Sequence, residues 1–196
     1  MSAASIAGPL VGRVLPGEGW ARTASLAGIA VLGSLILWAS AKISVPFWPV
    51  PMTLQTGAVA LIGLTCGWRL GLAAVILYLA EGAAGLPVFQ GTPEKGIGLA
   101  YLLGPTGGYL IGMALQVVVT GWLAERVLRG GVPKSLAAAL AGDVVLFACG
   151  LLWLGTLIGW DKPVLALGLY PFVLADLVKM ALAACAASAG WRLARP

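Results

Sequence analysis

The sequence predicts an all-α integral membrane protein whose chain folds into a bundle of six transmembrane helices. Only 10% of its 196 residues are charged and 60% are hydrophobic, whereas soluble domains carry about 25% charged residues. The apolar residues form segments long enough to cross a bilayer, since about 20 helical residues span the ~30 Å hydrocarbon core. Clusters of proline and glycine separate these segments, so each cluster is expected to mark a loop between helices.

The first 20 residues differ in composition from the rest of the chain. Residues 1–20 include two prolines and four glycines, which is typical of a loosely ordered tail. Residues 21–196 are expected to form a single six-helix membrane domain. Its first span covers about residues 21–41, which as a helix with a rise of 1.5 Å per residue is ~30 Å long.

A proline-rich segment follows the first span. Residues 45–52 read VPFWPVPM. Because prolines remove backbone donors and force extended backbone, this segment is expected to be a stiff loop. Two shorter apolar segments come next, residues 53–66 and 68–84, with Gly67 between them. Short helices in sequence are stable in a membrane only where protein covers their ends, so neighbouring helices are expected to enclose this part of the chain.

Three longer spans complete the predicted bundle. A second glycine- and proline-rich loop, residues 85–98, precedes a span over 106–128. A basic loop then leads to the fifth span at about 136–158, and a short turn leads to the sixth at about 170–193. Six spans place both chain termini on the same side of the membrane.

The positive charges indicate which side that is, because cytoplasmic loops of membrane proteins carry an excess of lysine and arginine. One side of the predicted topology carries Arg13, Arg22, Arg69, Arg126, Arg129, Lys134, Arg192 and Arg195. The other side carries Lys42, Lys95 and Lys162. Both termini are therefore expected in the cytoplasm, and both proline- and glycine-rich loops are expected to face outside.

The sequence excludes several classes of function. It contains no histidine, which removes Ser-His and Cys-His catalysis and HExxH zinc sites. It has no GxxxxGKS/T phosphate loop, so the chain itself is not expected to hydrolyse ATP. Cys66, Cys149 and Cys185 lie in apolar segments without C-x-x-C spacing and are expected to be small buried side chains. No metal or cofactor is expected.

Asp176 and Lys179 are the only charged residues between Pro163 and Gly190. A charged group in hydrocarbon costs about 2.5–3.5 kcal/mol on insertion scales. The i, i+3 spacing places both on one face of the sixth span. One interpretation is a structural ion pair between helices. The other is a ligand-binding pair that offers one strong acceptor and one strong donor to a cyclic urea or amide.

Residues on the outer side favour the second interpretation. A small-molecule pocket needs apolar walls with few polar groups, and the outer loops and helix ends supply both kinds of side chain. These candidates are Trp48, Gln55, Phe89, Gln90, Tyr101 and Tyr109. Glu81, near the outer end of the third span, is expected either to line the pocket or to cap a loop. Asp143, nearer the cytoplasmic end of the fifth span, is interpreted as a structural or hydrated carboxylate.

Four stretches carry a resemblance to a known family. They are ISVPFWPVPMTLQT at 43–56, YLAEGAAGLPVF at 78–89, LLGPTGGYLIG at 102–112 and the Asp-x-x-Lys of ADLVK at 175–179. In these motifs the chain, from about Leu26 to its end, resembles the BioY family. Members of that family are the biotin-binding S components of energy-coupling factor (ECF) transporters. The resemblance implies a six-helix S-component fold that binds biotin from the outer side, with residues 45–52 as a lid.

The resemblance also implies roles for individual residues. Asp176 is expected to accept a hydrogen bond from a ureido N–H of biotin, and Lys179 is expected to donate to the ureido carbonyl. The reverse arrangement, with Lys179 on the valerate carboxylate, stays open. Gln55 is the next candidate for contact with the ligand. The remaining candidates are Trp48, Gln90, Tyr101, Tyr109 and Glu81.

Partners follow from the same resemblance. S components act with a transmembrane coupling subunit and two cytoplasmic ATPases in the cytoplasmic membrane of prokaryotes. The small pairs Ala24-xxx-Gly28 and Ala30-xxx-Ser34 are expected to face the coupling subunit, because small residues allow close helix approach; Trp38 departs from that pattern. The chain is thus expected to be a transport subunit. An S component for another vitamin is the alternative, and an integral-membrane enzyme is a more distant one.

Overall fold

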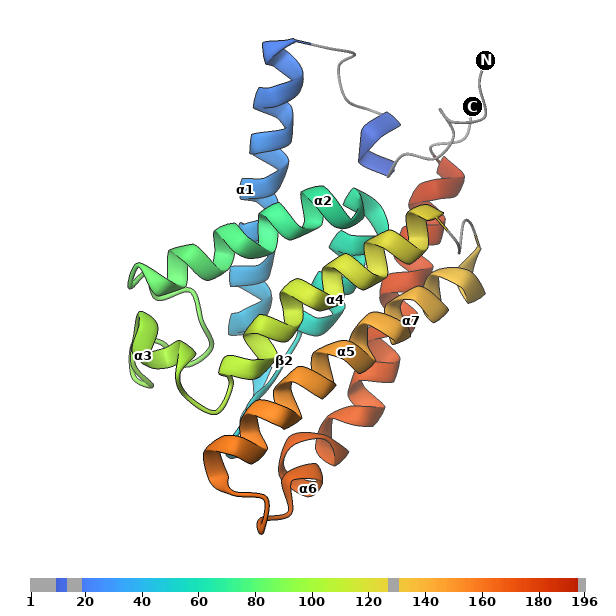
Figure 1. Cartoon of the computed structure of the whole chain (residues 1–196). Helices are drawn as coiled ribbons and strands as arrows, with labels where there is room; N and C mark the ends of the chain where they lie inside the picture. The colour runs from blue at the N-terminus through green and yellow to red at the C-terminus, as the bar shows by residue number, and fades with distance from the viewer. Residues whose placement is uncertain (1–9, 14–18, 127–130, 194–196) are drawn as a thin grey trace.

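The computed structural model of the chain describes residues 10–13, 19–126 and 131–193. Five long helices dominate it (Figure 1): α1 (Trp20–Lys42), α2 (Gln55–Ala83), α4 (Gly107–Arg126), α5 (Val132–Ile158) and α7 (Tyr170–Leu193). The shorter elements are the 3-10 turn η2 (Leu10–Arg13), strands β1 (Ser44–Val45) and β2 (Met52–Thr53), and helices α3 (Leu99–Leu102) and α6 (Val164–Gly168). Apart from loops and one two-stranded ladder, the described chain is therefore helical.

Five helical segments of the described chain are long and apolar enough to cross a membrane. They are α1, α2, α4, α5 and the run Val164–Leu193, which joins α6 to α7. Their outward faces carry exposed large apolar side chains such as Val31, Leu152 and Leu182, which suit contact with lipid. The chain is thus a multi-pass membrane protein.

Helix α4 lies at the centre of the bundle, between α2 and α5 (Figure 1). Helix α7 packs against α2 and α5, whereas α1 stands at the edge and packs mainly on α2. Two glycines of α4 bring it close to α5. A Cβ atom at Gly112 would lie 2.9 Å from the Leu146 carbonyl oxygen, and one at Gly108 would lie 2.2 Å from Trp153 Cβ. Neither position has room for a larger residue.

Helix α2 is bent at Gly67, where the sequence predicts the boundary between two segments. Gly67 has φ 80° and ψ 175°, a backbone conformation that is essentially restricted to glycine. Beyond the bend, the Trp68 amide donates to Glu125 Oε1 at 3.2 Å. Gly121 of α4 lies against the same turn, since a Cβ atom there would be 2.4 Å from the Trp68 nitrogen. The two predicted short segments are thus the two arms of one bent helix.

The core has two parts with different side chains. Near β1, β2 and the loops that flank α3, the buried aromatic residues are Tyr78, Phe89, Tyr101, Tyr109, Phe147 and Phe172. At the opposite end, α2, α5 and α7 meet through small residues, including Ala60, Ala138, Ala139, Ala183 and Ala187. Small side chains let helices approach closely, whereas large rings hold them apart. The aromatic part, called the loop end below, is where the bundle has room for a cavity.

Some element boundaries differ from the prediction. The ends of the proline-rich segment pair as β1 and β2, with Ser44 opposite Thr53 and Val45 opposite Met52, so this segment is a hairpin. Helix α5 starts earlier than the predicted residue 136 because Pro133 lies in its first turn, where the N–H that proline lacks has no helical partner in any case. Helix α6 lies in a stretch for which the sequence predicts no helix.

Part of the predicted topology lies outside the described residues. Of the predicted tail over residues 1–20, the structure describes η2, Gly19 and Trp20. The last two residues of the predicted span 106–128 lie outside the described residues. So do Arg129 and Arg195, two of the positive charges used to predict the cytoplasmic side. The predicted start and end of the first and sixth spans agree with α1 and α7 to within one residue.

Candidate functional site

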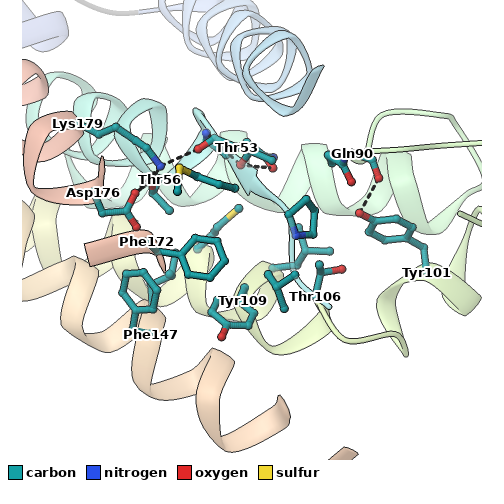
Figure 2. A pocket seen from close by; sticks show the side chains of 17 residues that line it. Thr53, Thr56, Gln90, Tyr101, Thr106, Tyr109, Phe147, Phe172, Asp176 and Lys179 are labelled. Carbon is teal, nitrogen blue, oxygen red and sulfur yellow. Dashed lines mark hydrogen bonds and ion pairs between the residues drawn. The ribbon is translucent and has the colours of Figure 1, made fainter. Parts of the chain in front are cut away.

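A cavity lies at the loop end of the bundle, among the hairpin, α2, α4, α5 and α7 (Figure 2). The space not filled by atoms is about 550 Å³, a figure that includes the open solvent at its mouth. Its lining residues are Val50, Pro51, Met52, Thr53, Gln55, Thr56, Gln90, Tyr101, Thr106, Tyr109, Leu110, Met113, Leu146, Phe147, Phe172, Asp176 and Lys179.

The pair predicted from the sequence stands at one end of this cavity. The Asp176 and Lys179 side chains are 3% and 11% exposed and form an ion pair. Lys179 Nζ also donates to the Thr53 carbonyl at 2.7 Å and to Thr56 Oγ1 at 3.1 Å. Thr56 Oγ1 in turn donates to Asp176 Oδ1 at 2.8 Å. Lys179, Asp176 and Thr56 therefore form a closed polar triangle (Figure 2).

This triangle satisfies the buried lysine. An ammonium group has three donors, and here they meet Asp176, Thr53 and Thr56. A buried ion pair is tolerated only when further hydrogen bonds compensate for the loss of water. A ligand carbonyl that reached Lys179 would replace one of these bonds with another of the same kind. The described structure thus satisfies both charges of the pair within the chain.

The local sequence explains how α2 and α7 meet at this point. Gly57 follows Thr56 in the first turn of α2 and faces the stem of Lys179. A Cβ atom at Gly57 would lie 3.1 Å from Lys179 Cβ, which is tighter than an ordinary van der Waals contact. The glycine therefore allows the Lys179 side chain to pass over α2 and reach the hairpin.

A second polar group lines the cavity away from the pair (Figure 2). The Tyr101 hydroxyl donates to the Gln90 carbonyl at 2.7 Å. The Gln90 side chain donates to Ser44 Oγ at 3.3 Å and accepts from Lys95 Nζ at 3.1 Å. Burial raises the pKa of the Tyr101 phenol, which a hydrogen bond with Thr106 partly offsets. Tyr101 is thus a neutral donor at physiological pH.

Apolar side chains occupy the region between the two polar groups. Phe147 and Phe172 lie with ring centroids 6.2 Å apart, and Phe147 meets Tyr109 edge-on at 6.1 Å. The Tyr109 hydroxyl donates to the Gly168 carbonyl at 2.8 Å, so its ring lines the cavity while its polar atom is already bonded. Figure 2 shows Phe172 and Tyr109 between the pair and Tyr101, with Phe147 next to Phe172. The cavity therefore has two polar ends and an apolar middle.

The structure brings six of the eight predicted ligand-binding residues to this cavity. They are Gln55, Gln90, Tyr101, Tyr109, Asp176 and Lys179. Trp48 does not line it and is 81% exposed near the tip of the hairpin. Glu81 accepts a hydrogen bond from Ser34 in the contact between α1 and α2. Of the two uses expected for Glu81, lining the pocket is therefore not seen, and it joins two helices instead of capping a loop.

Gln55 lines the cavity with its polar atoms already engaged. Its Nε2 donates to the Tyr78 hydroxyl at 2.9 Å, and its Oε1 accepts from Thr53 Oγ1 at 3.2 Å. The Tyr78 hydroxyl continues to the Val88 carbonyl at 3.3 Å. Gln55 therefore lines the cavity and also links the hairpin to α2. Through the Tyr78 hydroxyl it is connected to the loop before α3 as well.

Sequence reasoning missed other residues of the site. Thr56 is the next residue after Gln55 and could have been found by listing the remaining polar residues of that segment. Phe172 is spaced i−4 from Asp176, so helical periodicity places it on the same face. Phe147 and Met113 carry no comparable signal, because each reaches the cavity only through the packing of α5 and α4.

The four small residues proposed for partner docking do not share one face of α1. Ala24 and Gly28 are exposed, and a Cβ atom at Gly28 would meet nothing within 4 Å. Ala30 is half-buried. Ser34 is 0% exposed and donates to Glu81 of α2. Ser34 is thus used inside the chain, whereas Ala24 and Gly28 remain open on the outer surface of the bundle.

Comparisons with known proteins agree with these features. The family model described as the BioY family matches residues 14–196. A protein of Pyrococcus horikoshii named "Probable biotin transporter BioY" is 39% identical over 143 residues, covering 73% of this chain and 82% of the relative. The "Biotin transporter BioY" of Thermotoga maritima is 40% identical over 144 residues, covering 74% of this chain and 82% of the relative.

A solved structure has the same fold. It is described as the "Crystal structure at 2.1 A of the S-component for biotin from an ECF-type ABC transporter". The match has a TM-score of 0.77 and covers 90% of this chain and 95% of the other, with 22% sequence identity. The helical arrangement in Figure 1 is therefore that of an S component.

Proposed function

The chain belongs to the BioY family, and from that premise we propose that it binds biotin with high affinity and takes part in biotin uptake. Its relatives in Pyrococcus horikoshii and Thermotoga maritima carry the name biotin transporter. In this proposal the chain is the substrate-capture subunit of an ECF-type transporter and not an enzyme. Partner ATPases supply the energy, because the sequence has no phosphate loop.

The observation that carries the proposal is the chemistry of the cavity along its length. Biotin is a cyclic urea fused to a sulfur-containing ring, with a carboxylate at the end of an aliphatic chain. The cavity offers a carboxylate and an ammonium at one end, aromatic and aliphatic walls in the middle, and the neutral polar side chains of Gln90 and Tyr101 at the other end. Each part of the ligand therefore meets side chains of matching polarity.

In the proposed complex the ureido ring lies at the Asp176–Lys179 pair. Asp176 accepts from a ring N–H and Lys179 donates to the ring carbonyl, since a urea presents both groups side by side. The thiophane ring and the aliphatic chain lie along Phe172, Phe147 and Tyr109. The carboxylate then lies near Gln90 and Tyr101. The reversed orientation would place the aliphatic chain's carboxylate beside Asp176, where two negative charges repel.

The hairpin is the proposed lid over this ligand. Residues 50–53 of the hairpin line the cavity. Lys179 donates a hydrogen bond to the main-chain carbonyl of Thr53, at the end of the hairpin that leads into α2. Trp48, which is exposed in the hairpin, is proposed to contact the ligand only if the hairpin moves. Glu81 is proposed to influence ligand binding indirectly, by holding α1 against α2. Gln55 is proposed to do so by holding the hairpin in place.

The proposed membrane arrangement has six crossings with both termini in the cytoplasm of a prokaryote. It counts the two arms of α2 as separate crossings, with residues 1–20 as a tail and 21–196 as the membrane domain. Supporting it, positive charges gather on one side of the predicted topology.

A transmembrane coupling subunit is proposed to dock on the exposed α1 face at Ala24 and Gly28, together with two cytoplasmic ATPases. The chain is proposed to use no cofactor.

Equilibrium binding of radiolabelled biotin to the purified chain in detergent tests the proposal. We expect saturable binding of one biotin per chain with a dissociation constant below micromolar. Thiamine and riboflavin should not compete, whereas biotin amidated at its carboxylate should bind more weakly. No binding below micromolar, or displacement by another vitamin, would overturn the assignment of biotin as the ligand.

A further inference from the structure

A lysine stands next to the end of the cavity that lies away from the Asp176–Lys179 pair. Lys95 Nζ donates to Gln90 Oε1 at 3.1 Å, and Gln90 lines the cavity at that end (Figure 2). Lys95 is exposed and is not itself a lining residue. The Gln90 side chain therefore links the cavity to an exposed ammonium group.

The loop before α3 turns back on itself and so places this ammonium group. Gly91 has φ 70°, a backbone conformation that favours glycine, and the Lys95 amide donates to the Gly91 carbonyl at 2.8 Å. A Cβ atom at Gly91 would lie 2.6 Å from Lys95 Cδ and 2.9 Å from Lys95 Cε. The lysine stem therefore lies across the Gly91 backbone, which directs its nitrogen to the neighbouring Gln90.

Lys95 differs in its contacts from Lys42, the other lysine that bonds to this loop. Lys42 Nζ donates to three oxygen atoms of residues 87–92, so all the donors of its ammonium group are engaged. Lys95 has one side-chain hydrogen bond, to Gln90, and no ion pair within the described part of the chain, not even with the adjacent Glu94. An ammonium group has three donors, so Lys95 can still donate to a ligand.

We propose that Lys95 binds the carboxylate at the end of the ligand's aliphatic chain. The inference rests on the proposed function, which places the biotin carboxylate near Gln90 and Tyr101. Gln90 is neutral, and the Tyr101 hydroxyl already donates to the Gln90 carbonyl. A carboxylate can only accept hydrogen bonds, and it bonds most strongly to a charged donor. Lys95 supplies the positive charge that these two lining residues do not have.

This contact gives the two ends of the site different tasks. Asp176 and Lys179 neutralise each other, so that end of the cavity recognises a polar ring without selecting for the charge of the ligand. Lys95 makes the other end prefer an acid to its neutral amide. An ion pair at an exposed position contributes little and is screened by salt. The contact should therefore adjust affinity and selectivity, while most of the binding energy comes from the rest of the cavity.

Equilibrium binding of biotin and of biotinamide, its neutral carboxamide, to the purified chain in detergent tests the contact. The two ligands share their rings and aliphatic chain, so the ratio of their affinities isolates the effect of the carboxylate. We expect Lys95→Met to lower the affinity for biotin by roughly three- to tenfold. Its affinity for biotinamide and its melting temperature should not change. Lys95→Arg, which keeps the positive charge, should retain most of the preference for biotin.

Lys162→Met is the matched control, because Lys162 is an exposed lysine in the turn before α6 and does not line the cavity; it should keep the wild-type ratio of affinities. An unchanged ratio in Lys95→Met, or an equal loss of affinity for both ligands, would overturn the contact and leave the proposed function standing. A wild-type chain that binds neither ligand below micromolar concentration would overturn the proposed function, and the contact with it.

Discussion

Lys179 Nζ of α7 donates to the Thr53 carbonyl at the end of β2, 2.7 Å away. This bond joins the last long helix to the hairpin that covers the cavity. The same nitrogen pairs with Asp176, so the charged pair and the covering segment form one unit. A ligand that displaced Lys179 from Thr53 would therefore release the hairpin from α7.

Replacing Lys179 by methionine should weaken biotin binding and destabilise the protein. Hydrogen bonds to charged groups contribute about 1.5–3 kcal/mol, so affinity should fall by roughly 10- to 100-fold. Asp176 would also be left as an unpaired buried charge, at a cost of about 3–5 kcal/mol. The double variant Asp176→Asn/Lys179→Met should regain much of the melting temperature without regaining binding. Recovery of binding in the double variant would contradict the role of the pair in recognition.

Substituting alanine at Gly57 tests the close approach of α2 and α7. The added methyl group would lie 3.1 Å from Lys179 Cβ, which displaces the lysine stem by a few tenths of an ångström. We expect weaker biotin binding with a small change in melting temperature, measured by equilibrium binding and thermal unfolding. Gly28→Ala is the control, since nothing lies within 4 Å of the new methyl group. Equal affinities for the two variants would count against a precise position of Lys179.

Alanine at Gly67 should destabilise the bend in α2. The glycine's φ of 80° and ψ of 175° lie in a region where other residues are strained by about 1–3 kcal/mol. The expected result is a lower melting temperature with biotin affinity retained at temperatures where the protein is folded. Two residues of α2 line the cavity, Gln55 and Thr56. Both lie in the first turn of the helix, well before the bend at Gly67. An unchanged melting temperature would show that the backbone can leave this conformation without loss.

Lys42 connects α1 to the loop before α3 and should control how that loop covers the cavity. Its Nζ donates to the carbonyls of Pro87 and Phe89, each at 2.9 Å, and to Thr92 Oγ1 at 3.3 Å. Lys42→Met keeps the aliphatic stem and removes all three bonds. We expect faster amide exchange in residues 86–92 and faster dissociation of biotin.

The matched control for this experiment is Lys162→Met, because Lys162 is an exposed lysine paired only with its neighbour Asp161 among the described residues. It should change neither amide exchange in residues 86–92 nor the dissociation rate. If Lys42→Met behaved like Lys162→Met, the loop would be held by its own packing, chiefly by Phe89 stacked on Tyr101 at 4.9 Å.

Much of the fold could be predicted because a bilayer restricts what a chain can do. Apolar segments in lipid must satisfy their own backbone and therefore form helices, so length and composition were enough to place α1 and α7 closely. Gly67 was expected to separate two short helices, and it lies where the single helix α2 bends. The hairpin could not be predicted, since its pairing of Ser44 with Thr53 depends on how the prolines between them turn the chain.

The candidate site could be predicted only in part. A charged pair in an apolar helix is conspicuous because its burial is costly, so Asp176 and Lys179 were evident in the sequence. Glu81 was equally conspicuous, yet its partner is Ser34 of α1. Nothing in the sequence around an intramembrane carboxylate says which neighbouring helix it faces.

The sequence by itself determined that this chain is a helical membrane protein, where its long helices lie, and which charged pair is buried. Those properties follow from local composition and spacing, which act over a few residues. Only the tertiary structure decided that Thr56, Phe147 and Phe172 line the cavity together with Asp176 and Lys179. Those contacts join residues on separate helices, and their geometry depends on helix packing, which glycines such as Gly57 and Gly142 permit.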